Sequence, residues 1–217
     1  MSQAEPGAAS RSREHTRERL MDAAFEVFAE VGVTAASVEQ ITERAGFTRG
    51  AFYSNFDSKV ELFFAIADAK YANSTAGLAS GVGEVFADAL PAGHPLTPDI
   101  VEKIVPRVLS LTVVDAKWAL FESEFEALAL RDRDIAKRWA EHSREAATGL
   151  AELLDAALGR IGVRFRVPAD QATRMLIAAY NAAMKAQLLA GEAEPSAASL
   201  ADVTALALLL TERAPEA

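Results

Sequence analysis

Between residues 32 and 46 the chain carries closely spaced signals that start and stop helices, and these signals constrain the fold more than any other feature. Ser37 and Gln40 fit a capping box, in which the serine hydroxyl accepts from the N3 amide and the glutamine reaches back to the N-cap amide. Gly32 and Gly46 are placed to end helices, because glycine adopts the left-handed conformation at little cost. A short helix over residues 38–45 is therefore expected.

The flanking sequence predicts further helices around this one. Apolar residues recur at helical spacing over residues 16–30, a short helix begins at Thr48, and a second capping box at Ser58 and Glu61 opens a longer helix. Two short helices joined by a glycine turn and braced by another helix form the pattern of a helix-turn-helix. The pattern is weak evidence when taken alone, since short helices after glycine occur in many bundles.

Composition narrows the class of protein. The chain is rich in alanine and has few β-branched runs, which predicts an all-α fold. It has no cysteine, so disulfides and thiolate metal sites are excluded and a reducing, cytoplasmic location is expected. No apolar run reaches the roughly 20 residues that span a bilayer, and no signal peptide is recognisable, so no membrane partner is expected. The net charge of −9 argues against a general nucleic-acid coat.

Two cations stand at helix starts, where stability alone would favour acids. Arg49 follows Thr48 and Lys59 follows Ser58, and the helix dipole disfavours each cation by about 0.3–1 kcal/mol. A bound phosphate would remove the conflict. Gly50 would let the backbone approach a groove. Each residue alone is explained equally well as surface or core, but the set favours a DNA-contact surface.

The run LMDAAFEVFAEVGVTAASVEQITERAGFTRGAFYSNFDSKVELF, residues 20–63, resembles the DNA-binding domain of the TetR (tetracycline-repressor-like) family of transcription regulators. The resemblance implies that Arg49 reads a base edge. It also implies a recognition helix and a set of phosphate contacts, which together give the predicted DNA-binding residues Ser37, Thr48, Arg49, Gly50, Tyr53 and Lys59. Thr42 departs from the family, which usually has alanine there; its hydroxyl can bond the i−4 carbonyl.

We expect a disordered arm over residues 1–12, a helix-turn-helix domain over 13–63, and a larger helical effector-binding and dimerisation domain over 64–217. Glycines at 77, 81 and 83 make the stretch before residue 90 only loosely helical. Later helices are expected at about 99–110, 113–130, 134–160, 169–190 and 197–212. The resemblance over the second domain is weak.

By resemblance, the second domain both dimerises and binds a small, largely apolar effector. Two helices each carry a stripe of mostly apolar or small residues that could pack against a second copy of the chain, giving a homodimer for a palindromic operator. Each stripe fits the subunit's own core as well. The stripes are Ile135, Trp139, His142, Ala146, Leu150, Leu153 and Ala157, and Met175, Ala179, Ala182, Ala183, Ala186 and Leu189. The predicted ligand contacts are Trp118, Phe121, Phe125, Trp139, His142, Tyr180, Asn181 and Met184, any of which a core would also hold.

The leading functional hypothesis is a DNA-binding repressor released by its effector. A DNA-binding adaptor or structural protein without an effector is the alternative, and an all-helical enzyme is a weaker one. The three histidines are scattered and no catalytic, metal or cofactor motif is recognisable. Glu122 and Glu126 share a helix face and could in principle bind a metal, but a solvated face explains them better. We therefore expect neither catalysis nor a cofactor.

Overall fold

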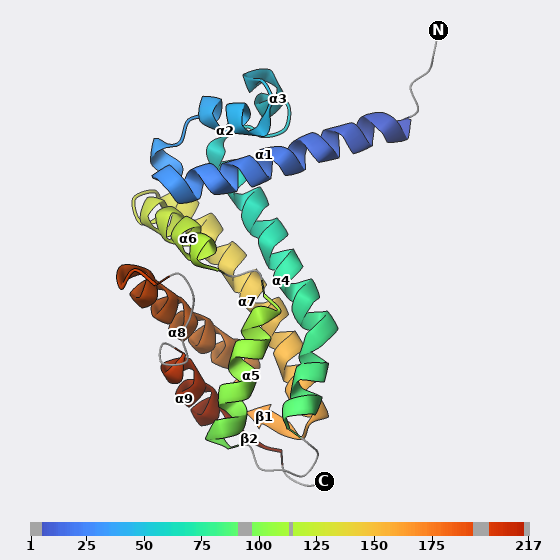
Figure 1. Cartoon of the computed structure of the whole chain (residues 1–217), viewed down its shortest axis with the longest axis vertical. Coiled ribbons are helices and arrows are strands. Elements are labelled where there is room, and N and C mark those ends of the chain that lie inside the picture. The colour runs from blue at the N-terminus through green and yellow to red at the C-terminus, as the bar shows by residue number, and fades with distance from the viewer. Residues whose placement is uncertain (1–5, 91–96, 113–114, 193–199, 215–217) are drawn as a thin grey trace. The chain divides into compact units, whose positions relative to one another are not determined.

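The computed structural model describes residues 6–90, 97–112, 115–192 and 200–214, and most of these residues are helical, which confirms the all-α class (Figure 1). The chain divides into two compact units, one formed by residues 1–70 with 120–132 and the other by 71–119 with 133–217. In chain order the elements are α1 (Pro6–Ala35), α2 (Val38–Ala45), α3 (Arg49–Tyr53), α4 (Lys59–Ala89), α5 (Pro98–Ser110), α6 (Ala116–Ala129), α7 (Arg133–Arg160), β1 (Val163–Phe165), α8 (Ala169–Leu189), α9 (Ala201–Leu210) and β2 (Thr211–Arg213).

An aromatic cluster forms the core of the N-terminal unit. The ring of Phe63, on α4, stacks on Phe125 at 3.6 Å and on Phe121 at 4.1 Å between ring centroids. Phe28 of α1 lies 6.1 Å from Phe121, and all four rings are fully buried. The sequence predicts Phe121 and Phe125 as ligand contacts, but the structure instead uses them to fill this core. The other six predicted ligand contacts belong to the C-terminal unit.

The first helix bends at Gly32, which was expected to end it. Gly32 has φ 80° and ψ 157°, outside the helical region. A Cβ at this position would meet the end of the exposed Glu124 side chain, which can move away, so it is the positive φ that requires glycine here. At its other end α1 extends back to Pro6, whereas residues 1–12 were expected to form a disordered arm. Residues 1–5 lie outside the described residues.

The fourth helix is longer and more regular than its glycines suggest. α4 runs without interruption through Gly77 and Gly81 to Ala89. A Cβ on Gly77 would overlap the Leu111 carbonyl oxygen, and one on Gly81 would lie 2.8 Å from a Leu111 methyl carbon. These glycines therefore allow the segment after α5 to pack closely against α4. They do not loosen the helix.

The C-terminal unit is built from the end of α4 and from α5, α7, α8 and α9. One of its apolar clusters joins α4, α5 and α7, with Leu78, Phe86 and Ile104 among its buried members. A second cluster includes Tyr180 and Met184 of α8.

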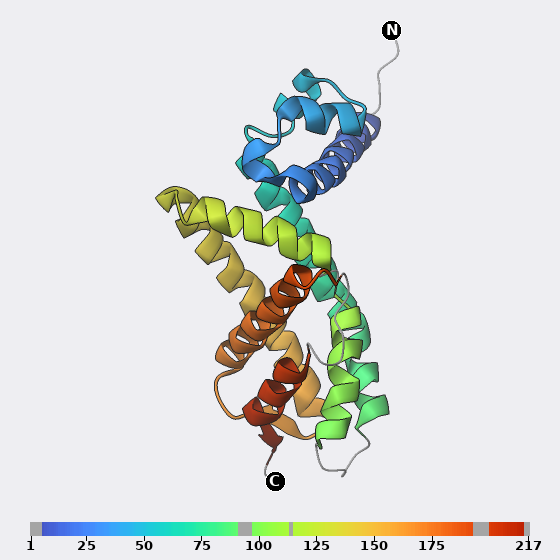
Figure 2. The same ribbon diagram turned by 60° about the vertical axis from the view of Figure 1, so that its left-hand side comes forward.

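Sequence analysis missed one feature of this unit, a short antiparallel pair of strands. β1 pairs with β2 so that Arg164 lies opposite Glu212, and β2 follows directly after α9, near the C-terminus marked in Figure 2. The Arg164 side chain donates twice to the Glu212 carboxylate, at 3.0 and 2.7 Å. Each strand has only three residues and pairs with a partner almost 50 residues away, so neither gives an alternating pattern that can be recognised.

The two stripes expected on α7 and α8 have different environments. On α7 the stripe faces inward: Leu150 and Leu153 pack against the first apolar cluster, and Ala157 is buried in it. On α8 the stripe is largely exposed, with Met175 at 40% and Leu189 at 90% exposure. The C-terminal part of the α7 stripe therefore serves the subunit's own core, while α8 keeps an apolar face exposed.

Candidate nucleic-acid interface

The second helix is fixed at both ends by the signals read from the sequence. The Gln40 amide donates to the Ser37 hydroxyl at 3.1 Å, and the Ser37 amide donates to the Gln40 side chain at 2.8 Å. Gly46 ends the helix in the left-handed conformation, with φ 73°. The Thr42 hydroxyl donates to the Glu39 carbonyl at 3.1 Å, one residue closer in sequence than expected. The predicted capping box is confirmed.

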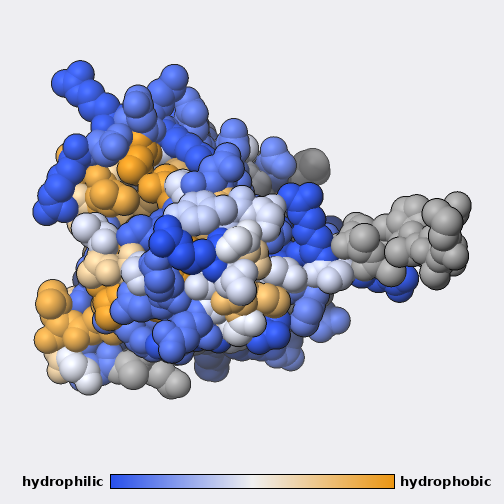
Figure 3. Space-filling view, turned by 90° about the horizontal axis from the view of Figure 1, so that it is seen from above, coloured by the Kyte–Doolittle hydropathy of each residue, from blue (hydrophilic) through white to orange (hydrophobic). Residues whose placement is uncertain are grey.

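The third helix begins where the sequence predicts and presents polar groups outward. The Ala51 amide donates to the Thr48 hydroxyl at 3.3 Å, so Thr48 is the N-cap. Phe52 is fully buried beneath the helix, while Thr48, Arg49 and Gly50 are exposed and Tyr53 is 50% exposed. In the space-filling view, hydrophilic residues cover much of the visible face, with hydrophobic patches among them (Figure 3). Four of the six predicted DNA contacts therefore lie together on one short exposed helix and its cap.

Arg49 lies between two side chains. Its Nη1 is 2.7 Å from Glu39 Oε1, although both side chains stay more than half exposed. Its guanidinium carbon lies 5.7 Å from the centre of the Tyr53 ring. Interaction with Tyr53, and after it the charge of Glu39, raises the pKa of Arg49 above its ordinary value. Arg49 is thus a permanent cation whose direction is restrained from both α2 and α3.

Gly50 has no internal reason to be glycine. It lies inside a helix, and no left-handed conformation is found there. A Cβ would meet only the Thr48 hydroxyl, at the ordinary contact distance of 3.6 Å. Glycine at this position costs the helix about 1 kcal/mol relative to alanine. Neither backbone conformation nor packing within the described part of the unit therefore requires glycine at this position.

Lys59 does not have the environment that was expected of a phosphate contact. Its ammonium donates to the carbonyls of Val33, Thr34 and Ala36, at 2.9, 3.3 and 2.5 Å. All three ammonium protons therefore have backbone partners. Burial lowers the pKa of the Lys59 ammonium below its ordinary value. In the structure Lys59 ties the start of α4 to the turn between α1 and α2.

The second capping box is only half formed. The Glu61 amide donates to the Ser58 hydroxyl at 3.1 Å, as predicted. The Glu61 side chain, however, accepts from the Asp57 amide at 2.6 Å and not from the amide of Ser58. The start of α4 is still capped, but the Glu61 side chain reaches back one residue further than in a regular capping box, to Asp57.

Two arginines of α1 hold the far end of α3, and sequence reasoning did not assign them a role. Arg13 donates to the Ser54 carbonyl at 3.0 Å, and Arg17 donates to the Asn55 carbonyl at 3.1 Å. Arg17 also lies 4.3 Å from the centre of the Phe56 ring. Cations are favourable beside the carbonyls that follow a helix. Their four-residue spacing was the only available signal, since it places both on one face of α1.

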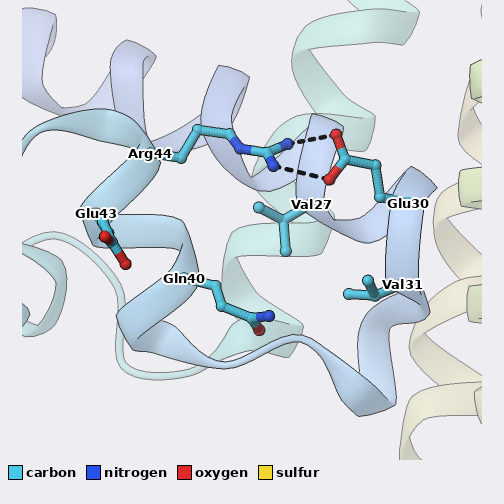
Figure 4. Close-up of a pocket in the computed structure, with 6 residues that line it drawn as sticks. All are labelled: Val27, Glu30, Val31, Gln40, Glu43 and Arg44. Carbon is cyan, nitrogen blue, oxygen red and sulfur yellow. Dashed lines mark hydrogen bonds and ion pairs between the residues drawn. The ribbon is translucent and has the colours of Figure 1, made fainter.

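A shallow hollow lies on the same unit, between α1 and α2 (Figure 4). Arg44 donates to both carboxylate oxygens of Glu30 at 2.7 Å across it. Gln40, Glu43 and two valines line the rest, and the valines lie toward the α1 side. The hollow is open and polar, so it does not match the apolar effector site expected in the second domain.

The remaining predicted ligand contacts gather in two places in the C-terminal unit. The Trp139 ring lies 5.6 Å from His142, and Tyr71 contacts both His142 and Trp118 at 5.2 and 5.4 Å between centroids. Tyr180 and Met184 instead pack in the second apolar cluster of this unit. Burial, followed by the charge of Asp115, raises the pKa of Tyr180. Asn181 follows Tyr180 on α8 and is half-buried.

Two absences hold for the described part of the chain. No cluster of three histidine, cysteine or acidic side chains in these segments is placed to hold a metal ion. Glu122 is buried, so the solvated face expected for it is wrong, because α6 packs this side inward. Within the same segments, no helix has the length and apolar character needed to cross a bilayer.

Comparison with known proteins agrees with the helix-turn-helix geometry. A family model described as bacterial regulatory proteins, tetR family, matches residues 20–66. The helix-turn-helix-type transcriptional regulator SrpR of Pseudomonas putida is 49% identical over 53 residues, which cover 24% of this chain and only 25% of that protein. The similarity to SrpR thus covers about a quarter of each chain.

Two further comparisons extend along most of the chain. A solved structure of the fatty acid degradation regulator FadR from Bacillus halodurans has a TM-score of 0.64 at 18% identity, covering 95% of this chain and 97% of that one. At this identity the likeness shows the fold. The helix-turn-helix-type transcriptional repressor AcnR of Corynebacterium diphtheriae is 30% identical over 157 residues, 71% of each chain. The chain therefore belongs to the tetR family of bacterial regulatory proteins.

Proposed function

We propose that the protein is a sequence-specific DNA-binding repressor of transcription, which binds a palindromic operator as a homodimer and leaves it when a small molecule binds. Membership of the tetR family supports this function, as does the naming of its relative AcnR as a transcriptional repressor. The proposal extends to the whole chain what the similarity to SrpR supports for 24% of it.

The observation that carries the proposal is the exposed face of α3. Gly50 is a glycine that neither packing nor backbone conformation requires, and it stands between an exposed cation and an exposed phenol. A DNA groove gives such a face a purpose, because the backbone approaches the bases most closely where no Cβ intervenes. The groups around it match the chemistry of bases and phosphates.

We assign separate roles to the residues of this face. Arg49 reads a base edge, with guanine the natural partner of a guanidinium. Ser37, Thr48 and Tyr53 contribute hydroxyl groups to phosphate oxygens, which positions the unit along the duplex without reading sequence. Lys59 contributes indirectly, since it holds the turn from which Ser37 enters α2.

The exposed face of α8 supports the homodimer. Its small residues, Ala178, Ala182 and Ala186, are exposed between Met175 and Leu189, and small side chains let two helices approach closely. A two-fold partner on this face would bury it. Two copies of α3 placed about 34–36 Å apart would then match adjacent turns of the major groove and an inverted repeat.

For the effector we propose the C-terminal unit, at the aromatic cluster of Tyr71, Trp118, Trp139 and His142. Trp118 and Trp139 are the chain's only tryptophans, so tryptophan fluorescence reports on this unit alone. We expect an effector to change this fluorescence at the same concentration at which it releases DNA. A compound that releases DNA with no fluorescence change would contradict the proposed place.

The test of the DNA-binding function uses Gly50→Ala, because its two effects have opposite signs. Alanine should raise the free energy of unfolding by up to about 1 kcal/mol and should weaken retardation of the DNA upstream of the protein's own gene. The control is Gly149→Ala on α7, where a new Cβ meets nothing within 4 Å. The control should be stabilised with unchanged DNA affinity. Equal DNA affinity for parent and Gly50→Ala would contradict the proposed α3 face.

A further inference from the structure

One acidic side chain lies where a DNA-binding surface would be expected to avoid negative charge. Glu39 is on the first turn of α2, is exposed, and its Oε1 lies 2.7 Å from Nη1 of Arg49. A carboxylate near phosphates is repelled by them. A simpler explanation is that Glu39 only favours the positive end of the α2 dipole. That explanation does not require contact with the one arginine on the exposed face of α3.

The contacts of Arg49 restrain the direction of its guanidinium. Arg49 is reached from α2 by Glu39 and from its own helix by the Tyr53 ring, 5.7 Å away. An exposed ion pair contributes little to folding stability, since water and salt screen it. The value of this pair must therefore be sought in the direction it gives to the guanidinium.

We infer that Glu39 is a positioning residue which fixes Arg49 for reading one base pair of each operator half-site. The inference rests on the proposed DNA-binding function and names the residue that sets its specificity. A guanidinium has five N–H donors, and a bidentate contact to guanine uses two of them. Nη1 lies against Glu39 and the guanidinium also interacts with Tyr53, so with one donor used by each, three of the five remain and two of them can serve O6 and N7.

The same carboxylate also disfavours contacts between Arg49 and phosphate groups, which do not depend on the base sequence. A free arginine side chain next to a duplex can turn to a phosphate, where it binds any sequence equally. Glu39 holds Arg49 back from that position, because leaving the carboxylate unpaired near DNA is unfavourable. Specificity is then increased at some cost in overall affinity, as expected where discrimination depends partly on repulsion.

The experiment compares Glu39→Gln with Glu43→Gln in the full-length protein. Glu43 is exposed on the same helix and carries the same charge, so both variants lose one negative charge. Binding is measured to the duplex that the parent selects from random DNA, to its single-base variants, and to a scrambled duplex. Arg49→Ala and the double variant Glu39→Gln with Arg49→Ala complete the cycle.

Both glutamine variants should bind scrambled DNA slightly more tightly than the parent. Only Glu39→Gln should lower the ratio of selected to scrambled binding, by about fivefold or more, the lower end of one bidentate base contact. The loss should fall on one base pair per half-site and should vanish in the Arg49→Ala background. If Glu39→Gln keeps the same ratio as Glu43→Gln, the inference is wrong while the DNA-binding function stands. If the parent selects no duplex, both fail together.

Discussion

The starts of α3 and α4 look alike in sequence and differ in the structure. Each begins with a hydroxyl N-cap followed at once by a cation, Thr48 with Arg49 and Ser58 with Lys59. Arg49 points into solvent beside Glu39. Lys59 turns toward backbone carbonyls of residues 33–36, which belong to a segment more than 20 residues earlier. The same local pattern therefore presents one cation to a possible ligand and uses the other to hold the unit together.

The difference teaches how far a local signal extends. A cap followed by a cation shows that the helix dipole is not being complemented by an acid. It does not show what provides the compensating negative charge. For Lys59 the carbonyl oxygens of the α1–α2 turn provide it, and only the three-dimensional arrangement shows this. For Arg49 the partner is a side chain that leaves much of the guanidinium open.

The largest effect is expected from Arg49→Ala. Removing the base contact should weaken binding to the selected operator by about 1–3 kcal/mol. Binding to scrambled DNA should change less, and thermal unfolding very little, because the side chain is exposed. Titrations of both duplexes and a melting curve check this. A uniform loss on both duplexes would move Arg49 from base reading to phosphate contact.

A smaller effect is expected from Lys59→Met, and it should fall on folding stability and not on DNA binding. The variant keeps the aliphatic stem but leaves three carbonyls without their donor, so unfolding should become easier by about 1–2 kcal/mol. The slope of log affinity against log salt should stay close to that of the parent. Lys103→Met, at an exposed position on α5, is the control for loss of one charge. If Lys59→Met keeps the stability of the parent and its salt slope is smaller by about one, Lys59 contacts a phosphate, as the sequence predicts.

The two N-caps should respond less strongly. Thr48→Ala removes the hydroxyl that caps α3, and Ser58→Ala removes the one that caps α4. Each should lower the free energy of unfolding by about 1 kcal/mol. Thr48→Ala should also weaken operator binding, whereas Ser58→Ala should leave the selectivity between operator and scrambled DNA unchanged. Equal losses of selectivity in both variants would remove the distinction between the two helix starts.

The smallest effect is a pH dependence that belongs to Lys59. Burial lowers its pKa, so just below the ordinary lysine value the unfolded chain binds more protons than the folded chain. The contribution of Lys59 to stability should therefore rise with pH through this interval and fall as pH decreases. Denaturant unfolding of the parent and of Lys59→Met between about pH 8 and 10.5 gives the difference. A contribution that falls with rising pH would contradict the burial of this ammonium.

The sequence predicted best what depends on neighbouring residues. The bounds of α2, its capping box, its glycine stop and the Thr48 cap are all settled by groups within four residues of one another. The position of Arg49, Gly50 and Tyr53 on one exposed helix followed from these bounds. The family resemblance added their roles, which the geometry accommodates.

What the sequence did not predict depends on contacts between distant segments. Phe121 and Phe125 were assigned to a ligand site because aromatic residues suit pockets and cores equally, and only the stacking on Phe63 distinguishes the two. Gly77 suggested a loose helix, although the reason for the glycine is Leu111, more than 30 residues away. The pairing of Glu39 with Arg49 likewise joins two helices across a turn.

Selection of duplexes from a random pool by the full-length protein at low ionic strength tests the central claim most directly. Enrichment of an inverted repeat whose half-sites lie about one helical turn apart, with one base pair in each half-site lost as a preference in Arg49→Ala, is the expected result. Recovery of the input pool without enrichment, at a protein concentration where the chain is folded, would contradict it.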